Sequence, residues 1–154
     1  MLQAGERMPD LMLLDAEGAP LSLHSYQGKP LVVYFYPKAD TPGCTSEAKD
    51  FTALASDFAA AGVAIIGISK DKPAKLAKFR DKYELTVTLA SDEEGAACEA
   101  FGTWVEKSLY GRSYMGIARA TFLVGADGKI LRVWSAVKVK GHATAVLEAV
   151  RALG

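Results

Sequence analysis

One cysteine stands where a strand pattern gives way to a helical pattern, in the run Thr41-Pro42-Gly43-Cys44. Thr41 is a good N-cap, because its hydroxyl can accept a hydrogen bond from an unpaired amide of the first turn. Pro42 suits the first helical position, where no backbone donor is required. Cys44 then falls in the first turn, where the positive end of the helix dipole favours a thiolate over a thiol. The local sequence therefore predicts a reactive cysteine at a strand-to-helix turn.

The alternative for a lone cysteine is a small buried apolar side chain. An exposed first turn between Thr41 and Glu47 fits that alternative poorly, so we interpret Cys44 as reactive. The second cysteine, Cys98, lies in an apolar stretch farther along the chain, where burial is at least as good an interpretation. A carboxylate one turn into a helix is stabilised by the dipole whatever its function, so Glu47 is assigned a structural or supporting role.

The bulk composition limits the classes of function. The chain has 154 residues, half of them apolar and 23% charged, which predicts one globular domain spanning residues 1–154. Its 18 basic and 18 acidic side chains balance, which argues against nucleic acid or an anionic membrane as a main partner. No apolar run approaches the roughly 20 residues of a membrane helix, and no secretory signal is visible. Two cysteines and two histidines are too few for a four-ligand zinc site, so we expect no metal or cofactor, and a cytoplasmic thiol protein.

Apolar patterns predict the elements that hold the cysteine turn. Residues 31–36 and 63–68 are continuous apolar runs rich in β-formers, typical of central strands covered on both faces. The helix between them carries a one-sided apolar stripe from Phe51 to Phe58 and ends near Gly62. A strand–helix–strand order predicts parallel pairing with a right-handed crossover.

The remaining elements complete a recognisable order. They are expected as a hairpin of residues 11–14 and 21–23, a helix at 73–83, a strand at 86–89, a short helix from a Ser91–Glu94 capping box to residue 101, a hairpin of 121–124 and 130–134, and a helix from about His142. Residues 104–118 show little periodicity and are expected to form a long loop with some strand. The predicted fold is α/β and thioredoxin-like, with a central mixed sheet flanked by helices, an N-terminal hairpin and an inserted segment.

Three motifs lie in order along the chain: Pro37-x-x-x-Thr41-x-x-Cys44, which continues through residue 48, then residues 114–124 around Arg119, then residues 137–147. The first resembles the active-site signature of peroxiredoxins, which are thiol-dependent peroxidases. All three are similar to signatures of the bacterioferritin-comigratory, or Q, subgroup. The resemblance covers nearly the whole chain.

The resemblance implies a role for each site residue. Cys44 would be the peroxidatic cysteine, which attacks a hydroperoxide and becomes a sulfenic acid. The Thr41 hydroxyl, the Arg119 guanidinium and nearby backbone amides would stabilise the charge on the departing oxygen. Pro37 would shield the thiolate from water. From its position alone, Arg119 is equally consistent with an ordinary surface arginine.

The chain departs from the subgroup at one position. Many members carry a resolving cysteine five residues after the peroxidatic one, and here that position is Lys49. Cys98 lies 54 residues downstream of Cys44, on a different predicted helix. We therefore expect an external thiol to reduce the sulfenic acid, with Cys98 as an intramolecular resolving cysteine as the alternative.

The resemblance also implies partners. The substrates would be hydrogen peroxide and organic hydroperoxides, and the reductant would be thioredoxin, glutaredoxin or a glutathione-like thiol. A monomer or weak homodimer is expected. Other functions fit less well: a dithiol oxidoreductase needs a second cysteine where Glu47 stands, and neither histidine lies in a motif that would serve a Cys–His hydrolase. A non-catalytic interaction module of the same fold is the remaining alternative.

Overall fold

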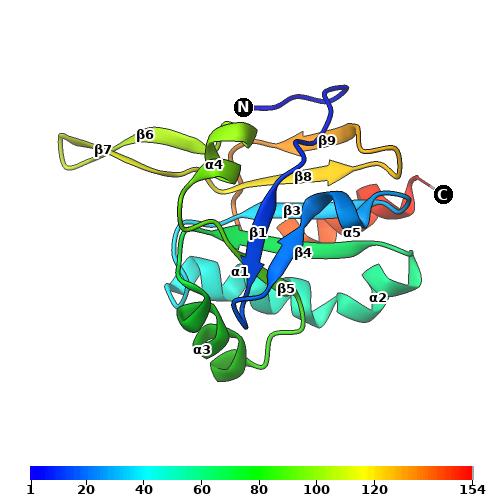
Figure 1. Ribbon diagram of the computed structural model, residues 1–154, viewed down its shortest axis with the longest axis horizontal. Coiled ribbons are helices and arrows are strands. Elements are labelled where there is room, and N and C mark those ends of the chain that lie inside the picture. Colours follow the sequence, from blue (N-terminus) through cyan, green and yellow to red (C-terminus); the bar gives the residue numbers. More distant parts are fainter. Residues whose placement is uncertain (154) are drawn as a thin grey trace.

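The computed structural model describes residues 1–153 and places a seven-stranded mixed sheet at the centre of the molecule (Figure 1). The strand order is β2-β1-β5-β4-β3-β8-β9. The elements are, in chain order, β1 (Met12–Asp15), β2 (Pro20–Ser22), the 3-10 helix η1 (Leu23–Tyr26), β3 (Leu31–Phe35), α1 (Pro42–Ala53), α2 (Ala55–Ala60), β4 (Ala64–Ser69), α3 (Pro73–Tyr83), β5 (Thr88–Ser91), α4 (Ala96–Phe101), β6 (Trp104–Leu109), β7 (Arg112–Ile117), β8 (Ala120–Val124), β9 (Ile130–Trp134) and α5 (His142–Arg151). The mixed sheet with flanking helices that the sequence predicts is confirmed.

Strand β3 lies inside the sheet, and all five of its residues are buried. It pairs in parallel with β4, as the strand–helix–strand order predicts, and antiparallel with β8. Its Tyr34 lies opposite Gly67 of β4, where a Cβ would stand 2.6 Å from the tyrosine ring. A glycine at position 67 therefore leaves room for a large aromatic ring over the centre of the sheet.

Alternate residues of β3 point to two separate cores, as the pleat of a strand requires. Val32 and Tyr34, with Tyr36 directly after the strand, belong to a core that also includes buried residues of α1, α2, α3 and α5. Leu31, Val33 and Phe35 belong to the core on the other face, which α4 covers. The two faces of the sheet are thus closed by different helices.

Several predicted boundaries are wrong in instructive ways. The long helix after β3 is two helices, because the chain breaks at Leu54 between α1 and α2. The Ser91–Glu94 capping box is absent: Ser91 ends β5, and its hydroxyl donates to the Asp71 carbonyl at 2.6 Å. The carboxylate of Asp92 instead accepts from two amides at the start of α4. The side chain that caps this helix is thus one residue away from the predicted one.

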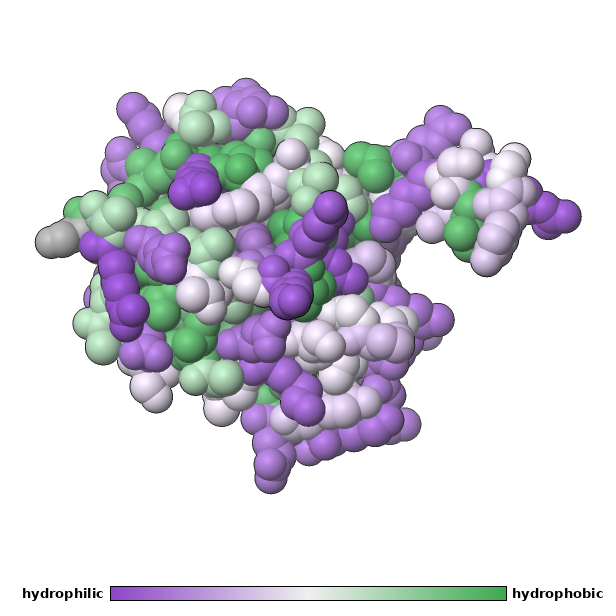
Figure 2. Space-filling model, turned by 180° about the vertical axis from the view of Figure 1, so that it is seen from behind, coloured by the Kyte–Doolittle hydropathy of each residue, from purple (hydrophilic) through white to green (hydrophobic). Residues whose placement is uncertain are grey.

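The expected loop at residues 104–118 is a regular hairpin, β6 and β7, paired over six residues. Its turn, Tyr110-Gly111, has positive φ at both residues, 51° and 77°, which is the backbone of a tight hairpin turn. The ribbon projects from the body of the molecule (Figures 1 and 2). Because most of its side chains are exposed, its strands lack the alternation that reveals a half-buried strand in a sequence.

Candidate active site

The cysteine turn lies just beyond the carboxyl end of β3, at the start of α1. Thr41 has the extended backbone of an N-cap, φ −98° and ψ 156°, and Pro42 occupies the first turn as predicted. The Thr41 hydroxyl does not cap the helix, however. It donates to the Lys38 carbonyl at 2.7 Å and accepts no hydrogen bond from an amide of the first turn, so the predicted capping bond is absent. Cys44 stands in the first turn of this 12-residue helix.

The sequence predicts an exposed Cys44 in the first turn, but the residue is buried, with only 1% of its surface accessible. Arg119, from the start of β8, points Nη2 at the Cys44 sulfur at 3.4 Å. The guanidinium passes so close to the helix start that a Cβ at position 43 would lie 3.1 Å from Nη2. Gly43 therefore makes room for the arginine that contacts the sulfur.

Glu47 holds the same arginine from the other side. Its Oε1 accepts from Arg119 Nη1 at 2.7 Å, and only 1% of the glutamate is exposed. Burial raises the pKa of Glu47 to about 7, although the charge of Arg119 acts in the opposite direction. Its second oxygen, Oε2, has no hydrogen-bond partner among residues 1–153. Glu47 thus contacts the arginine that contacts the sulfur, which agrees with the supporting role predicted from the sequence.

The floor beneath this cluster is aromatic. Tyr34 stacks on Phe51 of α1 with ring centroids 4.8 Å apart, and its ring centroid lies 5.6 Å from that of Tyr36. Both phenols are buried, and burial is the main cause that raises their pKa values. The aromatic side chains below Cys44 are therefore uncharged at neutral pH, and the ionisable side chains that contact one another beside the sulfur are Arg119 and Glu47.

His142, at the start of α5, is buried on the same face of the sheet. Its Nε2 and the Thr121 hydroxyl lie 2.8 Å apart. Burial first, and then the charge of Arg119, lower its pKa to about 4. No hydrogen bond in the described part of the chain joins His142 to Cys44, so the geometry offers no base for a Cys–His hydrolase.

Cys98 lies on the opposite face of the sheet from Cys44. It is 0% exposed and belongs to the core that α4 covers, whereas Cys44 belongs to the core of α1 and α5. Burial, together with its neighbour Asp92, raises the pKa of Cys98 to about 12. Both cysteines are free thiols.

The predicted site residues are thus brought together in part. Cys44 and Arg119, which are 75 positions apart, are in contact. Thr41 lies at the N-cap directly before the helix, and the half-buried Pro37 begins the connection that leads to it. Among residues 1–153 no three histidine, cysteine, aspartate or glutamate side chains form a cluster that could hold a metal ion. No helix in that range is long and apolar enough to cross a membrane.

Comparisons with known proteins agree with this geometry. The model of the AhpC/TSA family matches residues 4–133. The chain is 46% identical over 146 residues to peroxiredoxin Bcp of Escherichia coli K12, covering 95% of this chain and 94% of that protein. It is 41% identical over 150 residues to peroxiredoxin Bcp of Bacillus subtilis, covering 97% and 96%. A solved structure of the Xanthomonas campestris bacterioferritin comigratory protein superposes with a TM-score of 0.91 at 41% identity, covering 97% of this chain and 98% of that one.

Proposed function

This chain belongs to the AhpC/TSA family and is a thiol-dependent peroxidase of the Bcp and peroxiredoxin Q kind, and from that premise we propose that Cys44 is its reacting sulfur. The observation that carries the proposal is the contact of 3.4 Å between the Arg119 guanidinium and the Cys44 sulfur. A cation at that distance stabilises negative charge on sulfur, and the thiolate is the nucleophilic form of cysteine.

The peroxide step transfers one oxygen atom to Cys44. The thiolate attacks the terminal oxygen of the hydroperoxide, a sulfur–oxygen bond forms, and the oxygen–oxygen bond breaks. Sulfur loses two electrons and becomes a sulfenic acid, the reversible first stage of thiol oxidation. The departing alkoxide or hydroxide takes up a proton and leaves as alcohol or water. The substrates are hydrogen peroxide and organic hydroperoxides.

Arg119 acts on both reacting atoms. Its planar guanidinium has several N–H groups, so it can hold the sulfur and still donate to a peroxide oxygen on which charge develops. Its Nη1 is already fixed by Glu47 at 2.7 Å, which leaves little freedom in the orientation of the fork. Glu47 therefore positions the arginine.

Thr41 and Pro37 complete the proposed site. Because the Thr41 hydroxyl gives its proton to the Lys38 carbonyl, it offers lone pairs to the substrate and can accept a hydrogen bond from the O–H of a hydroperoxide. Pro37 has no amide donor and limits the access of water to the sulfur. These two residues orient and shield the substrate, while Arg119 stabilises charge.

An external thiol completes the cycle. A disulfide requires two Cα atoms within about 7 Å, and the sheet separates the cores that hold Cys44 and Cys98. We therefore favour reduction by thioredoxin, glutaredoxin or a glutathione-like thiol over an intramolecular bridge to Cys98. With its two free thiols, the protein suits a reducing compartment such as the cytoplasm, as a monomer or weak homodimer.

One pair of variants tests this proposal. Cys44→Ser should abolish peroxide consumption, because a serine hydroxyl without an activating base is a very poor nucleophile at neutral pH. Cys98→Ser should remain within about twofold of the native rate. Mass spectrometry under non-reducing conditions, after one equivalent of hydrogen peroxide, should find one added oxygen on the peptide of Cys44. Full activity in Cys44→Ser would refute the assignment of Cys44 as the reacting sulfur, whereas no peroxide consumption by the native protein would favour the non-catalytic module. A Cys44–Cys98 disulfide in the native protein would restore the intramolecular alternative.

A further inference from the structure

The Cys44 sulfur is too well covered for a protein thiol to reach it in the folded state. Only 1% of the residue is exposed. A reducing thiolate must approach the sulfur of the sulfenic acid directly, and a protein thiol brings the bulk of its own chain with it. A hydroperoxide is small and needs far less room. The turn that precedes Cys44 must therefore move before the reductive step, and the contacts that hold it set how often it does.

Two consecutive residues tie this turn to α3 and to the connection before it. The Ala39 amide donates to Asp71 Oδ2 at 2.8 Å, and the Ser69 hydroxyl donates to the same oxygen at 2.8 Å. The Asp71 side chain is only 9% exposed. The first tie is thus a carboxylate held in place between β4 and α3.

The second tie is made by Asp40, which has a left-handed backbone with φ of 63°. The Tyr83 hydroxyl, at the end of α3, donates to Asp40 Oδ1 at 2.6 Å. Lys82 Nζ lies 3.0 Å from Asp40 Oδ2, but both side chains are exposed, so this ion pair contributes little. The bond from Tyr83 to Asp40 is exposed as well, but its donor is held in place, because the Tyr83 ring packs edge-on against the buried Phe79 with ring centroids 5.7 Å apart.

We propose that the hydrogen bond from Tyr83 to Asp40 is a latch that keeps the Cys44 turn closed against its thiol reductant. The inference rests on the proposed role of Cys44. In the closed turn Cys44 can meet a hydroperoxide. In the open turn the sulfenic acid meets an external thiol, a new sulfur–sulfur bond forms, and the hydroxyl leaves as water. The latch biases this equilibrium without touching either reacting group.

The contacts of the peroxide step lie on the other side of the sulfur. Arg119 directly precedes β8 and is held by Glu47 of α1. Among the described residues, neither side chain forms a hydrogen bond with α3. Loss of the latch should therefore increase the open population while leaving the arrangement of Cys44 and Arg119 in the closed population as it is.

Two variants act on the latch by different means. Tyr83→Phe deletes the donor hydroxyl and keeps the ring that packs on Phe79. Asp40→Asn replaces the charged acceptor with a neutral amide oxygen, which weakens the bond, and keeps a residue that tolerates the left-handed backbone. Alkylation of reduced Cys44 by iodoacetamide and reduction of its sulfenic acid by dithiothreitol should both become about two- to tenfold faster, the range that the net contribution of one hydrogen bond gives. The second-order rate with hydrogen peroxide should change by less than about twofold.

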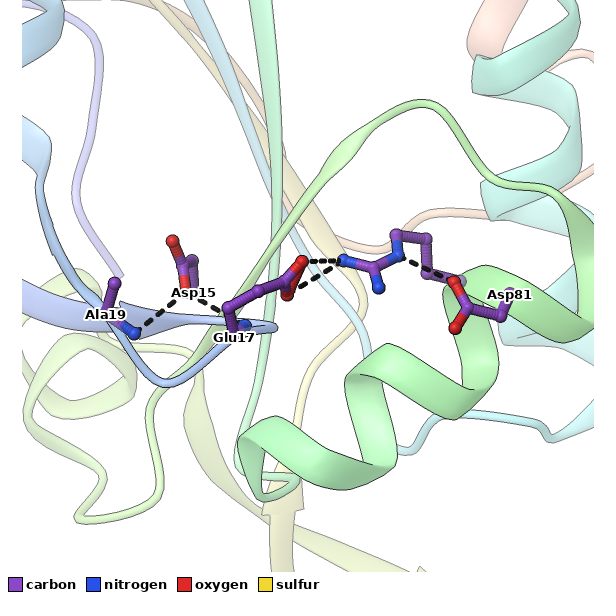
Figure 3. A network of polar contacts seen from close by, with 5 residues as sticks. Asp15, Glu17, Ala19 and Asp81 are labelled. Carbon is purple, nitrogen blue, oxygen red and sulfur yellow. Dashed lines mark hydrogen bonds and ion pairs between the residues drawn. The ribbon is translucent and has the colours of Figure 1, made fainter.

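The chain offers a matched control on the same helix. Arg80 of α3 is also bound to Glu17 in the turn between β1 and β2, a contact drawn in Figure 3, and this pair does not involve the Cys44 turn. Glu17→Gln should leave both Cys44 rates unchanged. Cys98, on the other face of the sheet, serves as an internal reference whose alkylation should stay slow in every variant.

Three results would overturn the latch. They are native alkylation and reduction rates in both latch variants, a parallel loss in the peroxide rate, and a parallel gain in Cys98 alkylation, which would indicate general loosening. Alkylation does not depend on peroxidase activity. The latch can therefore fail while Cys44→Ser still abolishes turnover, or hold while the proposed peroxide chemistry fails.

Discussion

The two cysteines are buried to the same degree, 1% and 0% exposed, on opposite faces of one sheet, yet their neighbours carry opposite charges. Cys44 stands at the start of a 12-residue helix with a guanidinium 3.4 Å from its sulfur. Cys98 stands in a helix of six residues beside the carboxylate of Asp92, and its pKa is raised to about 12. Burial therefore does not distinguish the two cysteines, whereas the sign of the nearest charge does. We propose that this charge makes Cys44 the reactive one.

The largest effect should come from removing the cation that distinguishes the two. Arg119→Ala should lower the second-order rate with hydrogen peroxide about 10²- to 10³-fold, the range seen when one charge-stabilising donor is removed from an active site. Stopped-flow measurement of Cys44 oxidation gives this rate directly. Arg132→Ala, which removes an exposed arginine from β9, is the control and should react at the native rate.

Arg119→Ala must also be shown to fold, because it leaves Glu47 buried without its partner. The charge of Arg119 lowers the pKa of Glu47, so its removal should raise that pKa further and keep the carboxyl protonated at neutral pH. A neutral carboxylic acid is tolerated in a buried site far better than an unpaired anion. A native circular dichroism spectrum together with an unchanged peroxide rate would remove Arg119 from the site.

The part of this arrangement that depends on local order could be predicted from sequence. Thr41-Pro42 predicts the start of a helix, and the apolar run of β3 predicts a buried strand. Together they place Cys44 in the first helical turn after that strand. The contact between Arg119 and Cys44 could not be predicted from the local sequence, because the two residues are 75 positions apart in the chain. It was expected only through the family resemblance. Gly43, whose missing side chain leaves room for the guanidinium, carries no local signal for that function.

The supporting role predicted for Glu47 agrees with its hydrogen bond to Arg119. Its burial could not be predicted from the helix dipole, which acts on any carboxylate in a first turn, because burial depends on the sheet beneath it. Other predictions failed for equally physical reasons. The hairpin of β6 and β7 was predicted as mostly loop, because a ribbon with both faces largely in water has no apolar alternation to read. The capping box predicted at Ser91 is absent because Ser91 is the last residue of β5 and pairs with Ser69 of β4.

The second largest effect is on how the free energy of unfolding depends on pH, through the two buried titratable groups on the Cys44 face, Glu47 and His142. Burial raises the pKa of Glu47 from an ordinary 4.5 to about 7, so between these values the folded protein binds more protons than the unfolded chain and loses stability as pH rises. The pKa of His142 is lowered from 6.5 to about 4, so between these values the unfolded chain binds more protons and stability rises with pH. The two effects oppose one another over most of the range from pH 4.5 to 6.5.

Single variants should separate the opposed effects. In Glu47→Gln, the free energy of unfolding at pH 7 relative to pH 4.5 should become more favourable to the folded state by about 3 kcal/mol than in the native protein. His142→Gln, which keeps a group able to bond with Thr121, should shift the curve in the opposite direction. Urea unfolding at several pH values gives both curves. Curves parallel to the native one would show that neither group is linked to folding as described.

The smallest effect should come from Cys98, and it tests the comparison from its inert side. Cys98→Ala removes one sulfur from a core that holds Phe35 and Phe101, and it should lower the free energy of unfolding by about 1 kcal/mol, as small buried deletions do. The peroxide rate should stay within about twofold of the native value, because the sheet lies between this core and Cys44. Urea unfolding and the peroxide assay measure the two quantities on one sample. If the peroxide rate fell by more than the loss of stability explains, the two faces of the sheet would be coupled. The charge beside each sulfur would then not be enough to explain the proposed difference in reactivity between Cys44 and Cys98.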